Sequence, residues 1–238
     1  MKHSILTLIA VCLFGHTFAH YLWIDTQETA KKGQKQEVRV FYGEYTYGVI
    51  EKVGGEAFEK VNKFKLWLID PEGNRLVLDA QPKEDHYLAT FTPNKEGTYT
   101  LLLDNDEIDV LDYSAYDFGI FKTHYHAVAK VQVGGKKQHS HADNKEGITV
   151  RNLSTETNKI KLQLLYKNEV LPNHEVNVFV ADQWSKTLES DEEGFVTFDL
   201  PWETTYLVEI TKKEEVPGTY KDVPYEFVWH CVTLSIKK

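Results

Sequence analysis

The stretch KTHYHAVAKVQV, residues 122–133, decides the fold class of this sequence. It forms a long extended segment that ends at the glycine pair 134–135, as expected of a β-strand followed by a turn. Shorter runs of the same character precede it, since residues 37–42 and 63–69 alternate with period two. Regular short strands separated by turns predict an all-β protein of the β-sandwich kind.

Turn residues indicate how some of these strands pair. The run 63–69 is followed by a turn, Asp-Pro-Glu-Gly-Asn, at 70–74 and by a second run at 75–78, which predicts a hairpin. We expect a similar pair between 86–91 and 97–103, across a Thr-Pro-Asn turn.

A polar segment, GKKQHSHADNKEG at 135–147, divides the strands into two groups. Because it contains few hydrophobic residues, we expect a linker or loop there. The sequence therefore predicts two consecutive β-sandwich domains, 20–134 and 148–238. One helix is expected, within 51–61, although the glycine pair 54–55 weakens it. In the second domain, extended runs are expected at 148–153, 159–166, 175–181, 194–200, 205–211 and 229–236.

Composition excludes several classes of protein. The chain has 238 residues, and 42% of them are hydrophobic, which is ordinary for a globular protein and excludes a mainly disordered chain. The formal net charge is −9, from 27 basic and 36 acidic residues. Nucleic-acid-binding domains usually carry a basic surface, so we expect no nucleic-acid partner.

Residues 1–19 have the pattern of a secretory signal peptide. A basic start is followed by an apolar run at 5–14 that is too short to span a bilayer, and Thr17 and Ala19 are small residues before a cleavage site. We expect cleavage after Ala19, a periplasmic or secreted location and no membrane span in the rest of the chain. Cys231 would then be the lone cysteine, which excludes an internal disulfide.

Cleavage at this position would make His20 the first residue. Its free α-amine and its imidazole Nδ1 could then chelate one metal ion, and the amine loses its proton near neutral pH. A nitrogen-rich ligand pair of this kind suits Cu(II) or Ni(II). The alternative is that His20 follows the cleavage site by chance.

Two His-x-His pairs offer further ligands. His124 and His126 lie in the extended segment, where residues i and i+2 point to the same face, so their imidazoles can bind one ion while Tyr125 and Ala127 face the other way. The alternative is an exposed polar face of an edge strand. His139 and His141 lie in the polar segment and form either a secondary metal site or part of a solvated linker.

The remaining sequence gives no catalytic signature. It contains no P-loop, no dinucleotide-binding glycine pattern, no G-x-S-x-G and no H-E-x-x-H. Cys231, in the terminal run beside His230, is interpreted as a small buried hydrophobic residue rather than a nucleophile. The sequence therefore predicts a non-catalytic protein.

Several stretches, taken in order, resemble one family: AHYLW at 19–23, the run from KGQ to GE at 32–44, YHAVAKVQVG at 125–134, and LPNHEV with SDEEGFVTF within 171–198. They resemble a periplasmic family of unknown function whose members are described as NikM-like components of nickel and cobalt ABC uptake systems. The last stretch is similar to carboxypeptidase-regulatory-like and transthyretin-like β-sandwiches.

The resemblance implies two β-sandwiches, immunoglobulin-like or transthyretin-like, with a role in divalent metal handling. His20, Trp23 and Lys130 match the family pattern. His124 and His126 depart from it, so their role as ligands depends on the strand argument alone.

Three functions follow from these observations. The first is a metal-binding protein in which His20 joins His124 and His126, with His139 and His141 as a delivery site. Its ion would be nickel or cobalt, with copper or zinc as alternatives, and it would pass the ion to a membrane transporter or an outer-membrane receptor. The second is a glycan- or protein-binding module that uses exposed aromatic residues such as Trp184 and Trp202. The third is an oxidative copper enzyme, ranked last because no internal disulfide can form.

Overall fold

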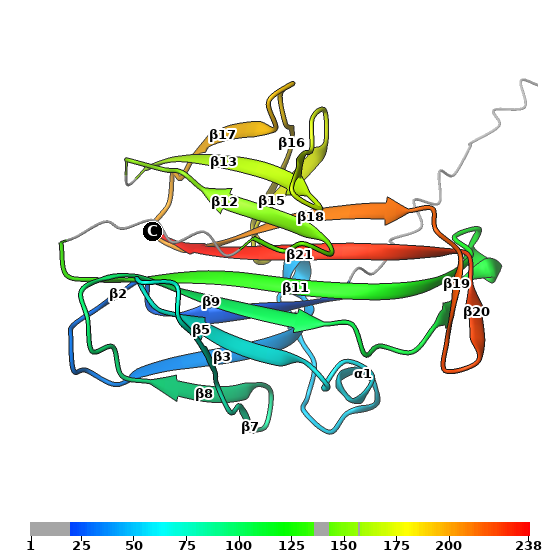
Figure 1. Ribbon diagram of the computed structural model, residues 1–238, viewed down its shortest axis with the longest axis horizontal. Helices are drawn as coiled ribbons and strands as arrows, with labels where there is room; N and C mark the ends of the chain where they lie inside the picture. The colour runs from blue at the N-terminus through cyan, green and yellow to red at the C-terminus, as the bar shows by residue number, and fades with distance from the viewer. Residues whose placement is uncertain (1–19, 136–142, 157) are drawn as a thin grey trace, which may run out of the picture.

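The computed structural model describes residues 20–135, 143–156 and 158–238 (Figure 1). The predicted signal peptide, and also His139 and His141, lie outside the described residues. Most of the described chain is β-strand, which confirms the all-β prediction. Among the described residues, no helix has the length and apolar character needed to cross a membrane.

The centre of the molecule is a ten-stranded mixed sheet. Its longest strand, β11 (Ile120–Val133), pairs in parallel with β21 (Phe227–Lys237) and antiparallel with β9 (Gly97–Asn105). Two short strands, β2 (Thr29–Ala30) and β10 (Leu111–Asp112), also pair with β11. The order across the sheet is β16 (Trp184–Glu189), β15 (Glu175–Val180), β18 (Thr205–Glu214), β21, β11, β9, β5 (Lys65–Ile69) and β6 (Arg75–Val77).

Two smaller sheets cover the opposite faces of this central sheet (Figure 1). The first contains β1 (Tyr21–Thr26), β3 (Gln36–Glu44), β4 (Val49–Ile50), β7 (Gln81–Pro82) and β8 (Tyr87–Phe91). The second contains β12 (Ile148–Asn152), β13 (Lys159–Tyr166), β14 (Glu169–Val170) and β17 (Phe195–Asp199). A hairpin of β19 (Gly218–Tyr220) and β20 (Val223–Tyr225) extends from one end.

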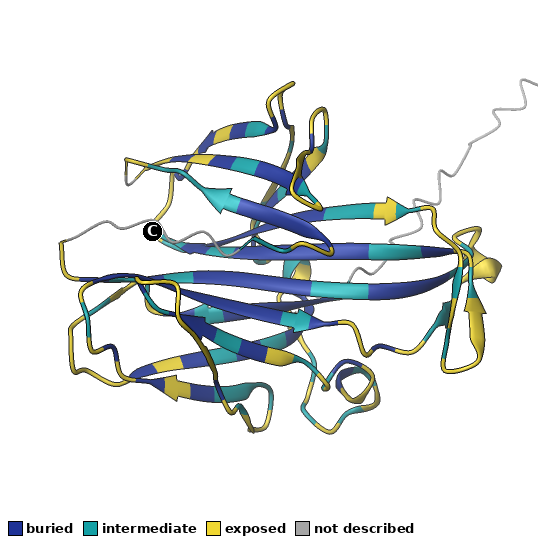
Figure 2. Cartoon of the chain, viewed as in Figure 1, coloured by how far each residue is buried: buried dark blue, intermediate teal, exposed yellow. Residues whose placement is uncertain are grey.

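Alternation along the central strands creates two separate cores. On β9, Leu101 and Leu103 pack against the first outer sheet, whereas Leu102 packs with residues of the second. Figure 2 shows the resulting burial along the central strands. Each core draws mainly on one of the two predicted halves, 20–134 and 148–238, but the pairing of β11 with β21 joins both halves in one continuous sheet.

The structure confirms one predicted hairpin and corrects another. Strands β5 and β6 pair across the turn at 70–74, as predicted. The predicted pairing of 86–91 with 97–103 is wrong, because β8 pairs with β3 and β7 while β9 pairs with β5 and β11. β9 is buried along nearly its whole length, so it needs a neighbour on each edge and lies in the sheet facing β8.

Helices are short throughout the described residues. The expected helix within 51–61 is reduced to α1 (Glu56–Glu59), which buries Phe58. Two turns of 3₁₀-helix, η1 (Tyr45–Tyr47) and η2 (Ser114–Tyr116), join strands, and each ends at a residue with positive φ.

Candidate metal centre

Strand β11 presents two different faces along its length. Lys122, His124 and His126 point to the side of an open cleft. Tyr125 and Ala127 point to the other side and pack in the core beneath the first outer sheet. The ring centroids of His124 and His126 are 4.1 Å apart, so the two imidazoles lie on one face, as the i, i+2 spacing predicts.

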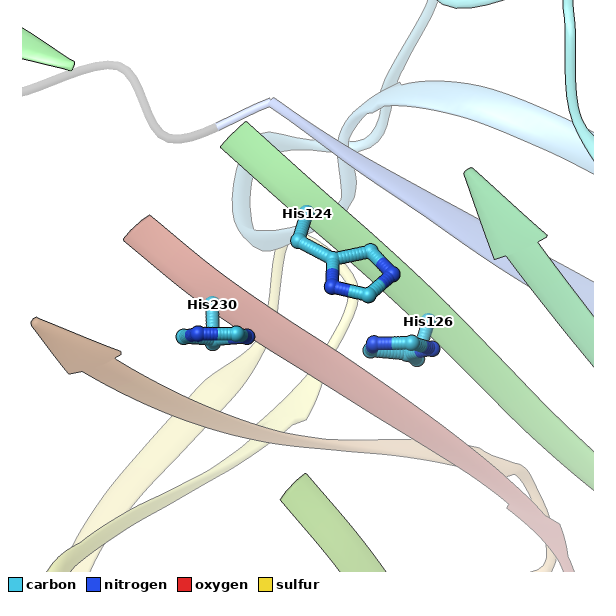
Figure 3. Close-up of side chains that lie close together, drawn as sticks. All are labelled: His124, His126 and His230. Atoms are coloured by element: carbon cyan, nitrogen blue, oxygen red, sulfur yellow. The ribbon is translucent and has the colours of Figure 1, made fainter. Parts of the chain in front are cut away.

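A third histidine comes from the neighbouring strand. Because β21 runs parallel to β11 with His230 opposite His124, the side chain of His230 points into the same cleft. Figure 3 shows His124 and His126 on β11 and His230 on β21. One nitrogen from each of the three rings lies within 4.8 Å of the others. Two nitrogens bound to one ion at about 2.1 Å are at most about 4.2 Å apart, so small rotations of the rings would complete a site.

Two carboxylates hold these rings. The Oδ1 atom of Asp104, on β9, lies 2.8 Å from His124 Nε2 and 2.9 Å from His126 Nδ1. On the other side, Glu214 Oε2 lies 3.0 Å from His230 Nε2, and Glu214 is itself paired with Lys167. Carboxylates that accept a hydrogen bond from one ring nitrogen orient the imidazole and fix its tautomer.

The tautomer of His230 leaves a lone pair without a partner. Because Glu214 accepts the Nε2 proton, Nδ1 carries the lone pair of the neutral ring. This Nδ1 is buried and has no hydrogen-bond partner among the described residues. The residue is only 2% exposed. A buried polar atom without a partner costs free energy, and a metal ion would supply that partner.

Residues 144–147 close one side of the cluster. The Asn144 side-chain amide lies 2.8 Å from His126 Nε2, so it donates a hydrogen bond to the lone pair of that ring. A Cβ added at Gly147 would lie 3.0 Å from His126 Nε2 and 3.2 Å from His230 Nδ1. The two nitrogens therefore converge on one small space beside a residue that has no side chain.

The protonation states suit a metal ligand set. Burial lowers the pKa of His126 to about 4, and burial also lowers the pKa of His230. Both rings are therefore neutral near pH 7, as coordination requires. Burial raises the pKa of Asp104, but the hydrogen bonds from His124 and His126 outweigh that effect and lower it overall. The carboxylate is thus ionised and adds negative charge beside the cluster.

The three histidines open onto a cleft of about 840 Å³. A buried structural zinc site usually has four protein ligands, whereas three ligands beside an open space leave a position for an exchangeable group. The arrangement is therefore suited to binding and releasing an ion.

The structure places His20 away from this cluster. Its main-chain oxygen accepts a hydrogen bond of 2.9 Å from the hydroxyl of Tyr125, which points to the opposite face of β11 from His124. The His20 ring instead lies 2.8 Å from Glu51 and packs beside Tyr42. The structure therefore does not join His20 to His124 and His126 in one site, because adjacent strand residues face opposite sides. The second predicted pair, His139 and His141, lies outside the described residues.

Sequence reasoning missed three groups that complete the centre. The sequence gives no basis for placing a partner beside His230, and no sequence pattern links Asp104 or Glu214 to a histidine. Their place depends on strand pairing between distant segments, for which the sequence gives no direct signal. Strand alternation alone would have separated His230 from Cys231, which is 2% exposed and packs on the opposite face with Tyr21 and Trp23.

The comparisons with known proteins identify a family. A family model described as a domain of unknown function, DUF4198, matches residues 17–214. The chain belongs to this family. The match to DUF4198 includes Asp104, His124 and His126 and ends before His230.

Other comparisons add no functional information. No curated protein matches this DUF4198 chain. Among solved structures, crystal structures of Salmonella alpha-2-macroglobulin, one reacted with methylamine and one of a mutant, are each 10% identical with a TM-score of 0.30. Each match covers 98% of this chain and 16% of the macroglobulin chain.

Proposed function

We propose that this protein binds a divalent transition-metal ion through His124, His126 and His230 and serves as a non-catalytic accessory to metal uptake. The observation that carries the proposal is the buried Nδ1 of His230, which has no hydrogen-bond partner in the described part of the chain and lies beside two further imidazoles. Glu214 and Asp104 support it, because carboxylates behind ligating histidines are usual in metal sites.

The donor set narrows the choice of ion. Imidazole suits nickel, cobalt, copper and zinc, whereas calcium and magnesium prefer oxygen ligands. The resemblance to NikM-like proteins favours nickel or cobalt. Intrinsic affinity favours copper, so supply of the ion and not affinity would decide which metal is carried.

Two features support transfer of the ion to another protein: the signal-peptide pattern and the open cleft. The signal-peptide pattern at 1–19 supports a periplasmic or secreted protein. The open cleft gives another protein access to the bound ion. A membrane metal transporter or an outer-membrane receptor is the proposed recipient.

Isothermal titration of the exported protein with Ni(II), Co(II), Cu(II) and Zn(II) tests the proposal. We expect one ion per chain, and His230→Ala should weaken binding more than about 100-fold, because even partners behind the ligands contribute 10–100-fold. His174→Ala is the matched control, since that ring donates to a backbone oxygen 2.7 Å away and lies outside the cluster. His20→Ala should leave the affinity unchanged. Absence of binding, or equal binding by His230→Ala, would overturn the proposal.

One observation favours the binding-module alternative. Trp184 and Trp202 lie edge to face with ring centroids 5.5 Å apart, and Trp202 is 47% exposed. Such aromatic pairs can stack on sugar rings. This alternative predicts that Trp202→Ala abolishes binding to a glycan array in the presence of a chelator, whereas the metal proposal predicts no effect of that substitution on nickel binding.

A further inference from the structure

The cleft beside the three histidines is far larger than a single ion requires. Its volume of about 840 Å³ lies within the range of small-molecule sites, roughly 300–1,000 Å³. Apolar and aromatic side chains, among them Trp67, Leu102 and Val228, form part of its wall. A cleft of this size and mixed character has room for an organic ligand next to the ion.

A buried lysine lies next to the metal centre. Lys122 is two residues before His124 on the same face of β11, which puts their Cα atoms about 6.6 Å apart. The side chain is only 8% exposed. Its Nζ donates to the main-chain oxygen of Asp106, and it lies 3.5 Å from the main-chain oxygen of Thr123.

Among the residues that the structure describes, no carboxylate lies within hydrogen-bond distance of this ammonium group. Within the described residues its hydrogen bonds go to main-chain oxygens, and its Nζ lies over the Tyr220 ring, 4.3 Å from the centroid. The carboxylates of Asp106, Asp109 and Glu107 act on it at longer range. Charged side chains that are buried usually pair with an opposite charge. A divalent ion on the neighbouring histidines would add further positive charge near this ammonium group, which Asp104 and Glu214 beside the rings would partly offset.

We propose that the cargo of this site is a metal–polycarboxylate chelate, in which one carboxylate binds the ion and another pairs with Lys122. The inference depends on the proposed metal site. Three imidazoles leave at least one coordination position for an oxygen donor from the ligand. A second carboxylate several ångströms away reaches the ammonium, and Trp67 and Val228 contact the carbon skeleton. A bare aquo ion satisfies the histidines but leaves Lys122 without a carboxylate at hydrogen-bond distance among the described residues.

Equilibrium dialysis with radiolabelled citrate as the probe tests the chelate. We expect citrate to be retained in a 1:1:1 ratio with nickel and protein, and to bind the nickel-free protein at least about tenfold more weakly. Lys122→Gln keeps a hydrogen-bond donor for Asp106 but removes the charge. This substitution should weaken citrate retention about tenfold or more, because a hydrogen bond to a charged group is lost. It should change the affinity for nickel alone by less than about twofold.

Two further variants make the result specific. Lys122→Arg keeps the positive charge and should retain most of the citrate binding. Lys186→Gln removes an exposed lysine on β16, outside the cleft, and should have no effect.

The outcomes separate this inference from the proposed function. If nickel binds but citrate is not retained, or if citrate removes the nickel, the chelate is excluded and the metal site stands. If Lys122→Gln and wild type retain citrate equally, the role of Lys122 is excluded. If nickel itself does not bind, both proposals fail.

Discussion

Where β11 and β21 lie side by side, their two faces have opposite chemistry. The cleft face carries His124, His126 and His230, held by carboxylates beside an open space. The closed face carries Tyr125 and Cys231, which pack against Tyr21 and Trp23 of the outer sheet. The same pair of strands thus provides both a binding surface and a core. The difference shows that in a sheet a shift of one residue exchanges ligand chemistry for packing.

The largest effect is expected on the closed face. Trp23 is 4% exposed, and its ring lies 5.5 Å from Phe41 and 5.4 Å from Tyr45. Trp23→Ala should lower the free energy of unfolding by about 3–5 kcal/mol, because it leaves a cavity. Urea denaturation measures this change, with Trp23→Phe as the milder control. Nickel affinity should remain within about twofold of wild type, and a loss comparable to that of His230→Ala would show that the two faces are coupled.

A carboxyl on the closed face should make stability depend on pH. Burial raises the pKa of Glu209 to about 7, and the hydrogen bond with Tyr21 only partly offsets this. The native pKa of Glu209 lies above its unfolded value. The contribution of Glu209 to the free energy of unfolding is therefore fully present below about pH 4 and is lost as the pH rises through about 7.

The size of this effect is at most about 3.5 kcal/mol, because the pKa rises by about 2.5 and each pKa unit is worth about 1.4 kcal/mol. Glu209→Gln should remove this part of the fall in stability between pH 4 and pH 8, measured by urea denaturation across that range. Glu169→Gln, at an exposed position of β14, is the control. An unchanged pH dependence in Glu209→Gln would show that another group titrates.

On the cleft face, the carboxylate behind His230 should affect metal binding without affecting the fold. Burial raises the pKa of Glu214, but hydrogen bonds from Lys167, His230 and Tyr166 outweigh it and lower the pKa to about 2. Glu214→Gln removes the charge that orients the ring. We expect nickel affinity to fall about 10–100-fold by titration calorimetry. Glu215→Gln, an exposed neighbour paired with Lys213, should change nothing. If the two variants bind nickel with equal affinity, Glu214 serves only in the ion pair with Lys167 and does not support the metal site.

The smallest effect is expected at Gly147. A methyl group there would lie 2.7 Å from the Asn144 amide and 3.0 Å from His126 Nε2, so Gly147→Ala must displace the amide or the ring. Nickel affinity should fall by a factor of a few, up to about tenfold, which corresponds to about 1.4 kcal/mol. Gly135→Ala is the matched control, because nothing lies within 4 Å of its added Cβ. If both variants bind nickel like wild type, the ion does not occupy the space beside Gly147.

The sequence determined the local properties of this protein. Period-two alternation and turn residues predicted the all-β class and the β5–β6 hairpin, because each depends on residues close together in the chain. The spacing of His124 and His126 predicted their common face, and Tyr125 the opposite one, since strand geometry alone requires it.

The tertiary structure decided which segments meet. His230 reaches the histidine pair only because the last strand runs parallel to β11 in register with it, and Asp104 reaches it through β9. The same geometry separates His20 from the pair. His20 contacts Tyr125, whose side chain lies on the opposite face of the sheet from His124 and His126. Pairing between distant strands depends on the packing of whole layers, including both cores, and no short stretch of sequence contains that information.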